Sequence, residues 1–146
     1  MSKLMKDIDY VLFSVDPVIL SIREGELSVL VVRRKTGPFK DVWGLPGGRV
    51  DQSECSDLDQ ALAQKLREKT GIEKMFFEQV QTYGSIEMDP RGWSVTTSYL
   101  ALIDSSSSRL LALEEHEHQK WLKVKSIGKE HKLAFWHDKI VLDAVS

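Results

Sequence analysis

The feature that most constrains this chain of 146 residues is a loop–helix segment at residues 43–72. The segment starts with a rigid Leu-Pro-Gly-Gly turn, whose two glycines permit backbone angles and close approaches that a Cβ would forbid. A polar loop follows, and then leucine recurs every four residues, at Leu58, Leu62 and Leu66. This spacing predicts a helix that presents one apolar stripe to a core.

The ends of this helix also carry signals. Ser56 is the expected N-cap, with acidic residues after it where the helix dipole favours anions. Gly71 is typical of the position just beyond a helix C-terminus. The polar face of the helix carries Lys65, Glu68 and Lys69, which lie within one turn. We therefore expect a loop, a helix with a mixed-charge face, and a second loop.

This segment resembles the Nudix box of the Nudix hydrolases. Gly48 and Glu54 match the opening of that motif, and its end is matched by Leu66, Glu68, Gly71 and Ile72. The chain departs from the motif in between, where it has two more residues than the family. It also has Gln64-Lys65 in place of Arg-Glu, and Glu68-Lys69 in place of Glu-Glu.

The departures concern the chemistry that the resemblance implies. Nudix hydrolases cleave a diphosphate with Mg²⁺ or Mn²⁺, which prefer oxygen ligands and stabilise the charge on the phosphoryl group. A lysine ammonium has no lone pair for a metal and repels it. Lys65 and Lys69 therefore leave Glu54 and Glu68 as the only box carboxylates for metal binding or catalysis.

Composition excludes several classes of protein. The net charge is −2 and no basic block is present, so binding of nucleic acid by this segment is not expected. The apolar runs are too short to span a bilayer, and the N-terminus lacks the apolar stretch of a signal peptide. The single cysteine, Cys55, excludes an internal disulfide and fits the cytoplasm.

The remaining pattern predicts an α+β fold, with a mixed β-sheet between helices (α/β/α), and this is also the Nudix architecture. Strands are expected where β-branched and aromatic residues alternate, with Pro17 dividing the first into two short strands or a bulge. The expected strands span residues 9–22, 27–34, 75–83, 93–104 and 119–127. A last helix is expected over residues 133–146, and the Glu-Glu-His-Glu-His run at 114–118 as a solvated charged loop.

The likeness extends to the Nudix domain of NrtR-type regulators of NAD metabolism. It rests on the stretches PFKDVWGLPGGRV, EKTG, DPRGWSV and LAF-x-H, and covers roughly residues 9–144. In that group an ADP-ribose pyrophosphatase-like domain binds ADP-ribose as an effector, and a winged-helix domain follows it. The resemblance implies a homodimer. We expect residues 1–146 to form one Nudix-like domain, without a winged helix in this chain.

Two functions stay open. In the first, the domain senses ADP-ribose or a related nucleoside diphosphate, because lysines can hold a diphosphate in place of a metal. Aromatic rings would stack on the adenine, and Gly47, Gly48 and His137 complete the expected binding residues. The candidates for diphosphate contact are Arg33, Arg34, Arg49, Lys65 and Arg91, and those for stacking are Phe39, Trp43 and Tyr83.

In the second, the chain is a metal-dependent hydrolase that releases AMP from ADP-ribose-like diphosphates. Glu54 and Glu68 would then act with substitute carboxylates, since loop acids can serve as general bases. The candidate substitutes are Asp51, Asp57, Glu87 and Asp89. A third interpretation is a protein-interaction domain without a working pocket.

Overall fold

A mixed seven-stranded sheet is the middle layer of the computed structural model, which describes residues 10–73, 75–107 and 113–146. Its main path runs in the order β3-β2-β1-β6-β5, while β4 pairs with β1 and β7 pairs with β2. The strands are β1 (Leu12–Arg23), β2 (Glu26–Arg33), β3 (Trp43–Gly44), β4 (Gly48–Arg49), β5 (Glu78–Ser85), β6 (Ser94–Ile103) and β7 (Gln119–Lys123). β1 and β6 are parallel, and the other pairs are antiparallel.

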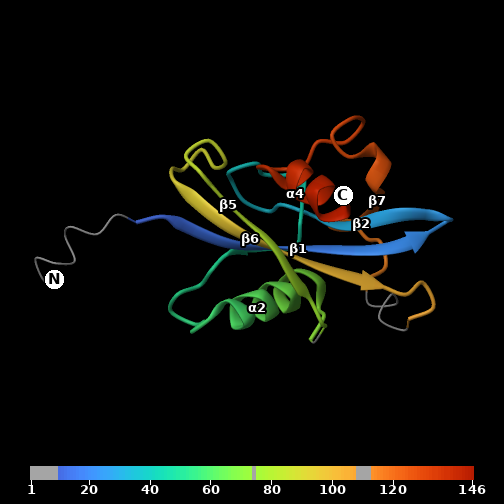
Figure 1. Ribbon diagram of the computed structural model, residues 1–146, viewed down its shortest axis with the longest axis horizontal. Helices are drawn as coiled ribbons and strands as arrows, with labels where there is room; N and C mark the ends of the chain where they lie inside the picture. Colours follow the sequence, from blue (N-terminus) through green and yellow to red (C-terminus); the bar gives the residue numbers. More distant parts are fainter. Residues whose placement is uncertain (1–9, 74, 108–112) are drawn as a thin grey trace, which may run out of the picture.

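Two helices cover opposite faces of this sheet (Figure 1). α2 (Leu58–Thr70) packs over one face, and α4 (His137–Val145) over the other. Each face has its own apolar core. Val15, Ile19 and Leu30 lie in the core with α2, whereas Val18 and Leu20 lie in the core with α4. The expected α+β sandwich is thus confirmed.

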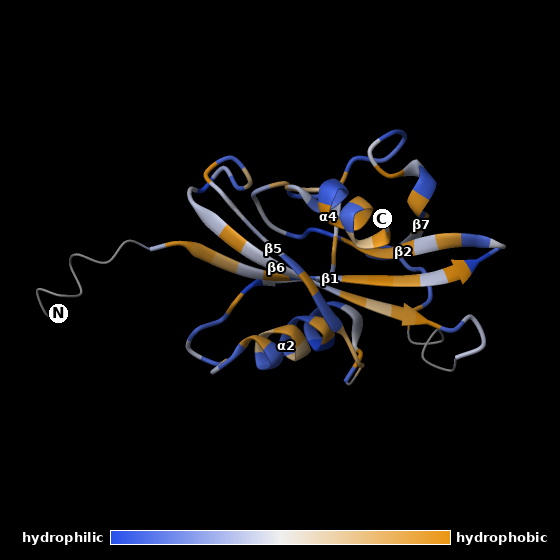
Figure 2. Cartoon of the chain, in the orientation of Figure 1, coloured by the Kyte–Doolittle hydropathy of each residue, from blue (hydrophilic) through white to orange (hydrophobic). Residues whose placement is uncertain are grey.

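The central strands are apolar on both faces because both are covered. Figure 2 shows apolar residues along much of β1 and β2, and polar residues on the outer side of α2. Sheets buried on both sides have such near-continuous apolar strands. Within the described residues, no helix is long and apolar enough to cross a membrane.

The prediction that Pro17 divides the first strand is wrong. β1 is continuous, and its parallel ladder with β6 includes the pair Pro17–Tyr99. On its other edge, β1 pairs with β4 at Ser14 and Val15 and with β2 only from Leu20 onward. Pro17 therefore lies where this edge has no partner strand, so a residue without an N–H is tolerated there.

Other predicted bounds shift by a few residues. Asp57, not Ser56, caps α2, because its carboxylate accepts the Gln60 N–H at 2.8 Å. Gly71 closes α2 in the left-handed conformation, as expected (φ 78°). α4 begins at His137, four residues later than predicted, and β7 ends at Lys123 before a 3₁₀ turn, Val124–Ser126.

β5 covers residues 78–85 rather than 75–83, because its final residues pair with the start of β6. The strand predicted at 93–104 is confirmed as β6. Residues 114–117 are exposed, in agreement with a solvated loop. The four consecutive serines at 105–108, a composition typical of a surface loop, form a turn at 105–106, and Ser108 lies outside the described residues.

Candidate functional site

A cavity of about 190 Å³ opens where the edge of β1 is unpaired. The glycine-rich turn crosses this gap, since β3 pairs with β2 and β4 pairs with β1. Side chains from β1, β6, α2 and the start of α4 therefore reach one space. The lining residues are Ser14, Asp16, Arg34, Thr36, Gly37, Gly47, Gly48, Arg49, Lys65, Lys69, Met88, Asp89, Arg91, Ser94, Thr96, Phe135, His137 and Ile140.

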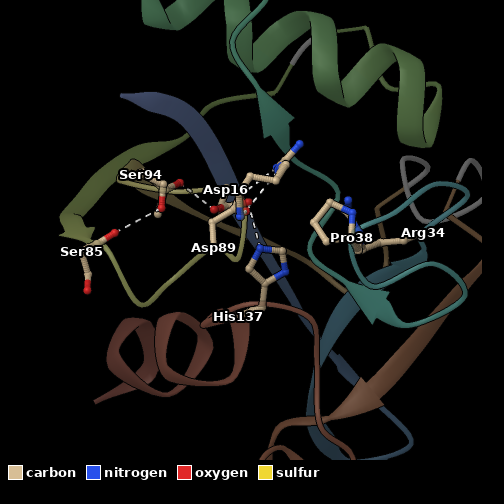
Figure 3. A network of polar contacts seen from close by, with 9 residues as sticks. Asp16, Arg34, Pro38, Ser85, Asp89, Ser94 and His137 are labelled. Carbon is tan, nitrogen blue, oxygen red and sulfur yellow. Dashed lines mark hydrogen bonds and ion pairs between the residues drawn. The ribbon is translucent and has the colours of Figure 1, made fainter. Parts of the chain in front are cut away.

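The buried pair of Asp16 and His137 joins β1 to α4 at this cavity (Figure 3). His137 Nδ1 accepts the Leu45 N–H at 2.9 Å, so the ring proton of a neutral imidazole must be on Nε2. Nε2 faces Asp16 Oδ1 at 3.3 Å, and the Thr96 hydroxyl donates to Asp16 Oδ2 at 2.6 Å. The network therefore fixes the turn, the sheet and α4 relative to one another.

The Asp16 carboxylate stays ionised in this setting. Burial by itself raises the pKa of Asp16, but His137, Thr96 and the positive charge of Arg34 outweigh it and hold the pKa below its usual value. The imidazole contributes as a hydrogen-bond donor, because its Nδ1 is occupied as an acceptor. Asp16 is thus a buried carboxylate with Thr96 and His137 at its two oxygens and a guanidinium nearby.

Close packing explains the glycines of the turn. A Cβ on Gly47 would overlap the Val15 carbonyl oxygen and crowd Asp16, and one on Gly44 would lie 2.9 Å from His137 Nδ1. Only glycine therefore lets the turn lie against β1 and the imidazole. At Gly48 the Lys65 side chain lies over the backbone, with Cε 3.4 Å from an ideal Cβ position.

Five cationic side chains give the cavity its charge: Arg34, Arg49, Lys65, Lys69 and Arg91. Partial burial and the neighbouring charges of Lys65 and Arg34 lower the pKa of Lys69. Burial and the charge of Arg91 likewise lower the pKa of Arg34. These shifts show that like charges are crowded here, and an anion in the cavity would relieve that repulsion.

The comparisons with known proteins agree with this geometry. The family model of the NUDIX domain matches residues 14–144 of the chain. The chain belongs to the Nudix family.

Three proteins are similar to this Nudix domain. The ADPR responsive transcriptional repressor NtrR of Acinetobacter baylyi is 38% identical over 91% of this chain and 52% of its own length. The ADP-ribose pyrophosphatase of Methanocaldococcus jannaschii is 30% identical, over 84% of this chain and 68% of its own. The NUDIX domain of Shewanella oneidensis NrtR, solved in complex with ADP ribose, has a TM-score of 0.81 at 32% identity and covers 99% of this chain and 97% of its own. The chain thus spans about half the length of the NtrR repressor.

The structure brings many of the predicted binding residues together. Those that line the cavity are Arg34, Gly47, Gly48, Arg49, Lys65, Arg91 and His137. Of the two arginines at the end of β2, only Arg34 lines this cavity, where its Nε donates to the Pro38 carbonyl at 2.8 Å. Arg33 instead pairs with Asp41 and lines a separate hollow with Glu68. Their roles in ligand binding stay predictions.

The three aromatic candidates do not line the cavity. Tyr83 is buried in the α4 core and donates its hydroxyl to Asp143 at 2.7 Å. Trp43 packs against the same core, with the Lys120 ammonium over its ring. Phe39 contacts Phe135 edge-on at 4.7 Å, and Phe135 is the aromatic residue that does line the cavity.

Sequence reasoning missed Asp16, Thr96 and Phe135. Asp16 could have been found, because a charged residue inside a strand that is otherwise apolar on both faces needs a polar partner. Its partner His137 lies 121 positions further along the chain, so no local pattern joins the two.

The donor atoms do not fit the divalent metal that Nudix hydrolases generally use. Glu54 and Glu68 are exposed and neither lines the cavity, and Lys65 Nζ lies 3.5 Å from Glu68 Oε2. In the described part of the chain, no group of three or more His, Cys, Asp or Glu side chains could hold a metal. Metal binding by Glu54 and Glu68 stays a prediction.

The proposed substitute ligands have other contacts. Asp57 caps α2, and Asp51 accepts hydrogen bonds from Ser53. Asp89 accepts hydrogen bonds from Arg91, with Nε donating to Oδ1 at 3.1 Å and Nη2 donating to Oδ2 at 2.8 Å. Glu87 is exposed on the loop before Met88 and does not line the cavity.

Proposed function

We propose that this Nudix domain binds ADP-ribose, or a closely related nucleoside diphosphate, as an effector that it does not hydrolyse. The observation that carries the proposal is the charge of the cavity. Lys65 and Lys69 occupy positions of the Nudix box helix where the family has carboxylates, and both line the cavity. In this proposal their ammonium groups bind the diphosphate directly, in the place that a metal ion has in the hydrolases.

The other charges of the cavity support an anionic ligand. Of its two carboxylates, Asp89 is paired with Arg91, and Asp16 is held by Thr96 and His137. Arg34, Arg49 and the two lysines then form a cationic excess. The guanidinium carbon of Arg34 lies 4.7 Å from the centre of the Phe135 ring, which supports the proposal that Arg34 holds a phosphate beside an apolar surface. An excess of one charge around a cavity favours a ligand of the opposite charge.

The relatives favour a sensing role. The NtrR repressor is by name ADPR responsive, and the NrtR domain was solved with ADP ribose. We extend ADP-ribose binding to this chain on that basis. In this proposal the domain supplies an effector site. Regulation of transcription belongs to the whole NtrR repressor, of which this chain matches about half. A homodimer and a cytoplasmic location are further parts of this proposal.

The deciding experiment is calorimetric titration with ADP-ribose, without and with Mg²⁺, followed by assay of the same solution for AMP. We expect binding that is independent of Mg²⁺ and leaves ADP-ribose intact. Lys65→Glu should weaken binding about tenfold or more, because it replaces a charge-assisted contact with a repulsive one. Lys129→Glu, an exposed position outside the cavity, is the matched control. Unchanged affinity in Lys65→Glu would contradict the role of the lysine.

Hydrolysis is the second candidate, because Glu54 and Glu68 are retained and the pyrophosphatase of M. jannaschii is a relative. It predicts release of AMP that requires Mg²⁺ or Mn²⁺ and is abolished by Glu68→Gln. If no AMP appears with either metal, hydrolysis is contradicted and sensing is the function that remains.

A further inference from the structure

The cavity has a polar floor that its cationic residues do not account for. This floor consists of Ser14 and Asp16 on β1 and of Ser94 and Thr96 on β6. The two strands are parallel with Ser14 opposite Thr96, and residues two apart lie on the same face. Further along β1, Val18 and Leu20 belong to the core with α4. On this face of β1, the side chains thus change from apolar to polar where the cavity begins.

A cavity that bound only an anion would not explain the buried Asp16 carboxylate. Its negative charge repels a diphosphate, and burial makes that repulsion stronger than it would be in water. Yet the surroundings keep it ionised rather than neutral. An ionised carboxylate accepts about four hydrogen bonds. The protein supplies the Thr96 hydroxyl at one oxygen and His137 Nε2 at the other, so acceptor capacity is left over beside the cavity.

Neutral hydroxyl groups of a ligand would match the remaining acceptor capacity of Asp16. Two serines lie beside this carboxylate: Ser14 lines the cavity, and the Ser94 hydroxyl makes only a long contact, 3.5 Å, to the Ser85 carbonyl. Serine hydroxyls can donate and accept, and a carboxylate can accept two neighbouring O–H groups. A pair of adjacent sugar hydroxyls presents this pattern.

We infer that the polar floor binds the adjacent hydroxyls of a ribose carried by the nucleotide, with Asp16 as acceptor and Ser14 as a supporting contact. This inference rests on the proposed function and names the second group, besides the diphosphate, that the cavity recognises. The hydroxyls belong either to the terminal ribose or to the adenosine ribose. Asp16 then distinguishes a ribose with free hydroxyls from other anions of similar charge.

The test is calorimetric titration of the wild type and Asp16→Asn with ADP-ribose, ADP and 2′,3′-dideoxy-ADP. Asparagine has the same shape but no charge, so a ligand that Asp16 merely repels should bind more tightly. The inference predicts the opposite for ADP-ribose, a loss of about 10- to 100-fold, because hydrogen bonds to an ionised acceptor are lost. Asp59→Asn, which removes an exposed charge on α2 outside the cavity, is the control.

Each outcome has one meaning. Loss for ADP-ribose with unchanged or tighter ADP binding assigns the floor to the terminal ribose. Loss for ADP-ribose and ADP, but not for the dideoxy compound, assigns it to the adenosine ribose. Equal or tighter binding of ADP-ribose by Asp16→Asn overturns the inference, and so does an equal loss for all three ligands. If the wild type does not bind ADP-ribose, the proposed function itself fails.

Ser14→Ala provides a second measure that perturbs the fold less, because Ser14 is only half-buried. It should weaken the same ligand that Asp16→Asn weakens, by a few-fold, and leave the dideoxy compound unaffected. Unchanged affinity of Ser14→Ala for every ligand would remove Ser14 from the floor. If Asp16→Asn does not fold, the Ser14→Ala variant decides, and its unchanged affinity for every ligand would contradict the inference.

Discussion

At the scale of single residues, Asp16 shows how a buried charge is maintained. Asp16 is 4% exposed, and such burial disfavours ionisation. The Thr96 hydroxyl and the Nε2–H of His137 offset that cost, and Arg34 adds a positive charge nearby. The Leu45 N–H in turn fixes the tautomer of the imidazole. One carboxylate thereby depends on groups from three different parts of the chain.

This arrangement predicts how the stability of the protein changes with pH. The pKa of Asp16 is lower in the folded state, so its contribution to the free energy of unfolding is present above the usual carboxyl pKa of about 4 and is lost as pH falls through the folded value. Asp16→Asn should cost about 1–3 kcal/mol at pH 7. The difference between the variant and the wild type should shrink in acid.

Urea denaturation at a series of pH values between neutrality and strong acid measures this directly. The matched comparison is Asp59→Asn, whose carboxylate is exposed in the first turn of α2. A difference between Asp16→Asn and wild type that stays constant with pH would contradict the depressed pKa of Asp16.

At the scale of elements, α2 is the part that places both lysines at the cavity. Its apolar side buries Ala61, Leu62 and Leu66 against the sheet, and this fixes its rotation about its own axis. Lys65 and Lys69, four residues apart, then lie on one face and point to the gap beside β1. The helix is stopped at both ends, by Asp57 and by the left-handed Gly71.

The capping geometry gives a prediction about two adjacent residues. Asp57→Ala should lower the free energy of unfolding by about 1 kcal/mol, because the Gln60 N–H loses its acceptor. Ser56→Ala should cost less than half as much, since its hydroxyl contacts only the exposed Gln60 side chain at 3.0 Å. Urea denaturation of the two variants decides between them. Equal costs, or a larger cost for Ser56→Ala, would place the cap at Ser56.

At the scale of the whole molecule, the charge of the cavity differs in sign from that of the chain. The net charge is −2, yet the residues that line the cavity include five cations and two carboxylates. The fold therefore separates charge, because it brings cations from the loop after β2, from β4, from α2 and from the loop before β6 to one place. The cavity therefore attracts an anion although the molecule as a whole is weakly negative.

Binding should accordingly depend on salt. Exposed charges are screened over about 10 Å at 0.1 M ionic strength, so the affinity for ADP-ribose should fall several-fold between about 0.05 M and 0.5 M NaCl. The affinity for adenosine, which is uncharged, should change little over the same range. Titrations at several salt concentrations measure both. An affinity for ADP-ribose that is indifferent to salt would argue against a cationic diphosphate site.

The sequence by itself determined the local elements and the two lysines on the polar face of α2. Leucine spacing and the Gly71 stop predicted α2, the β-branched runs predicted β1, β2 and β6, and the pair of lysines predicted a site for an anion. These features depend on neighbours within one or two turns or on strict alternation. Such patterns can be identified in a single sequence.

Only the tertiary structure decided which side chains meet. Pro17 is accommodated because one edge of β1 is unpaired, and Tyr83 is used by the core rather than by the cavity. Asp16 and His137 lie at opposite ends of the chain, and their contact exists because α4 packs over the sheet beside the gap that the glycine-rich turn crosses. Contacts of this kind depend on packing between distant segments, which local propensity and spacing do not specify.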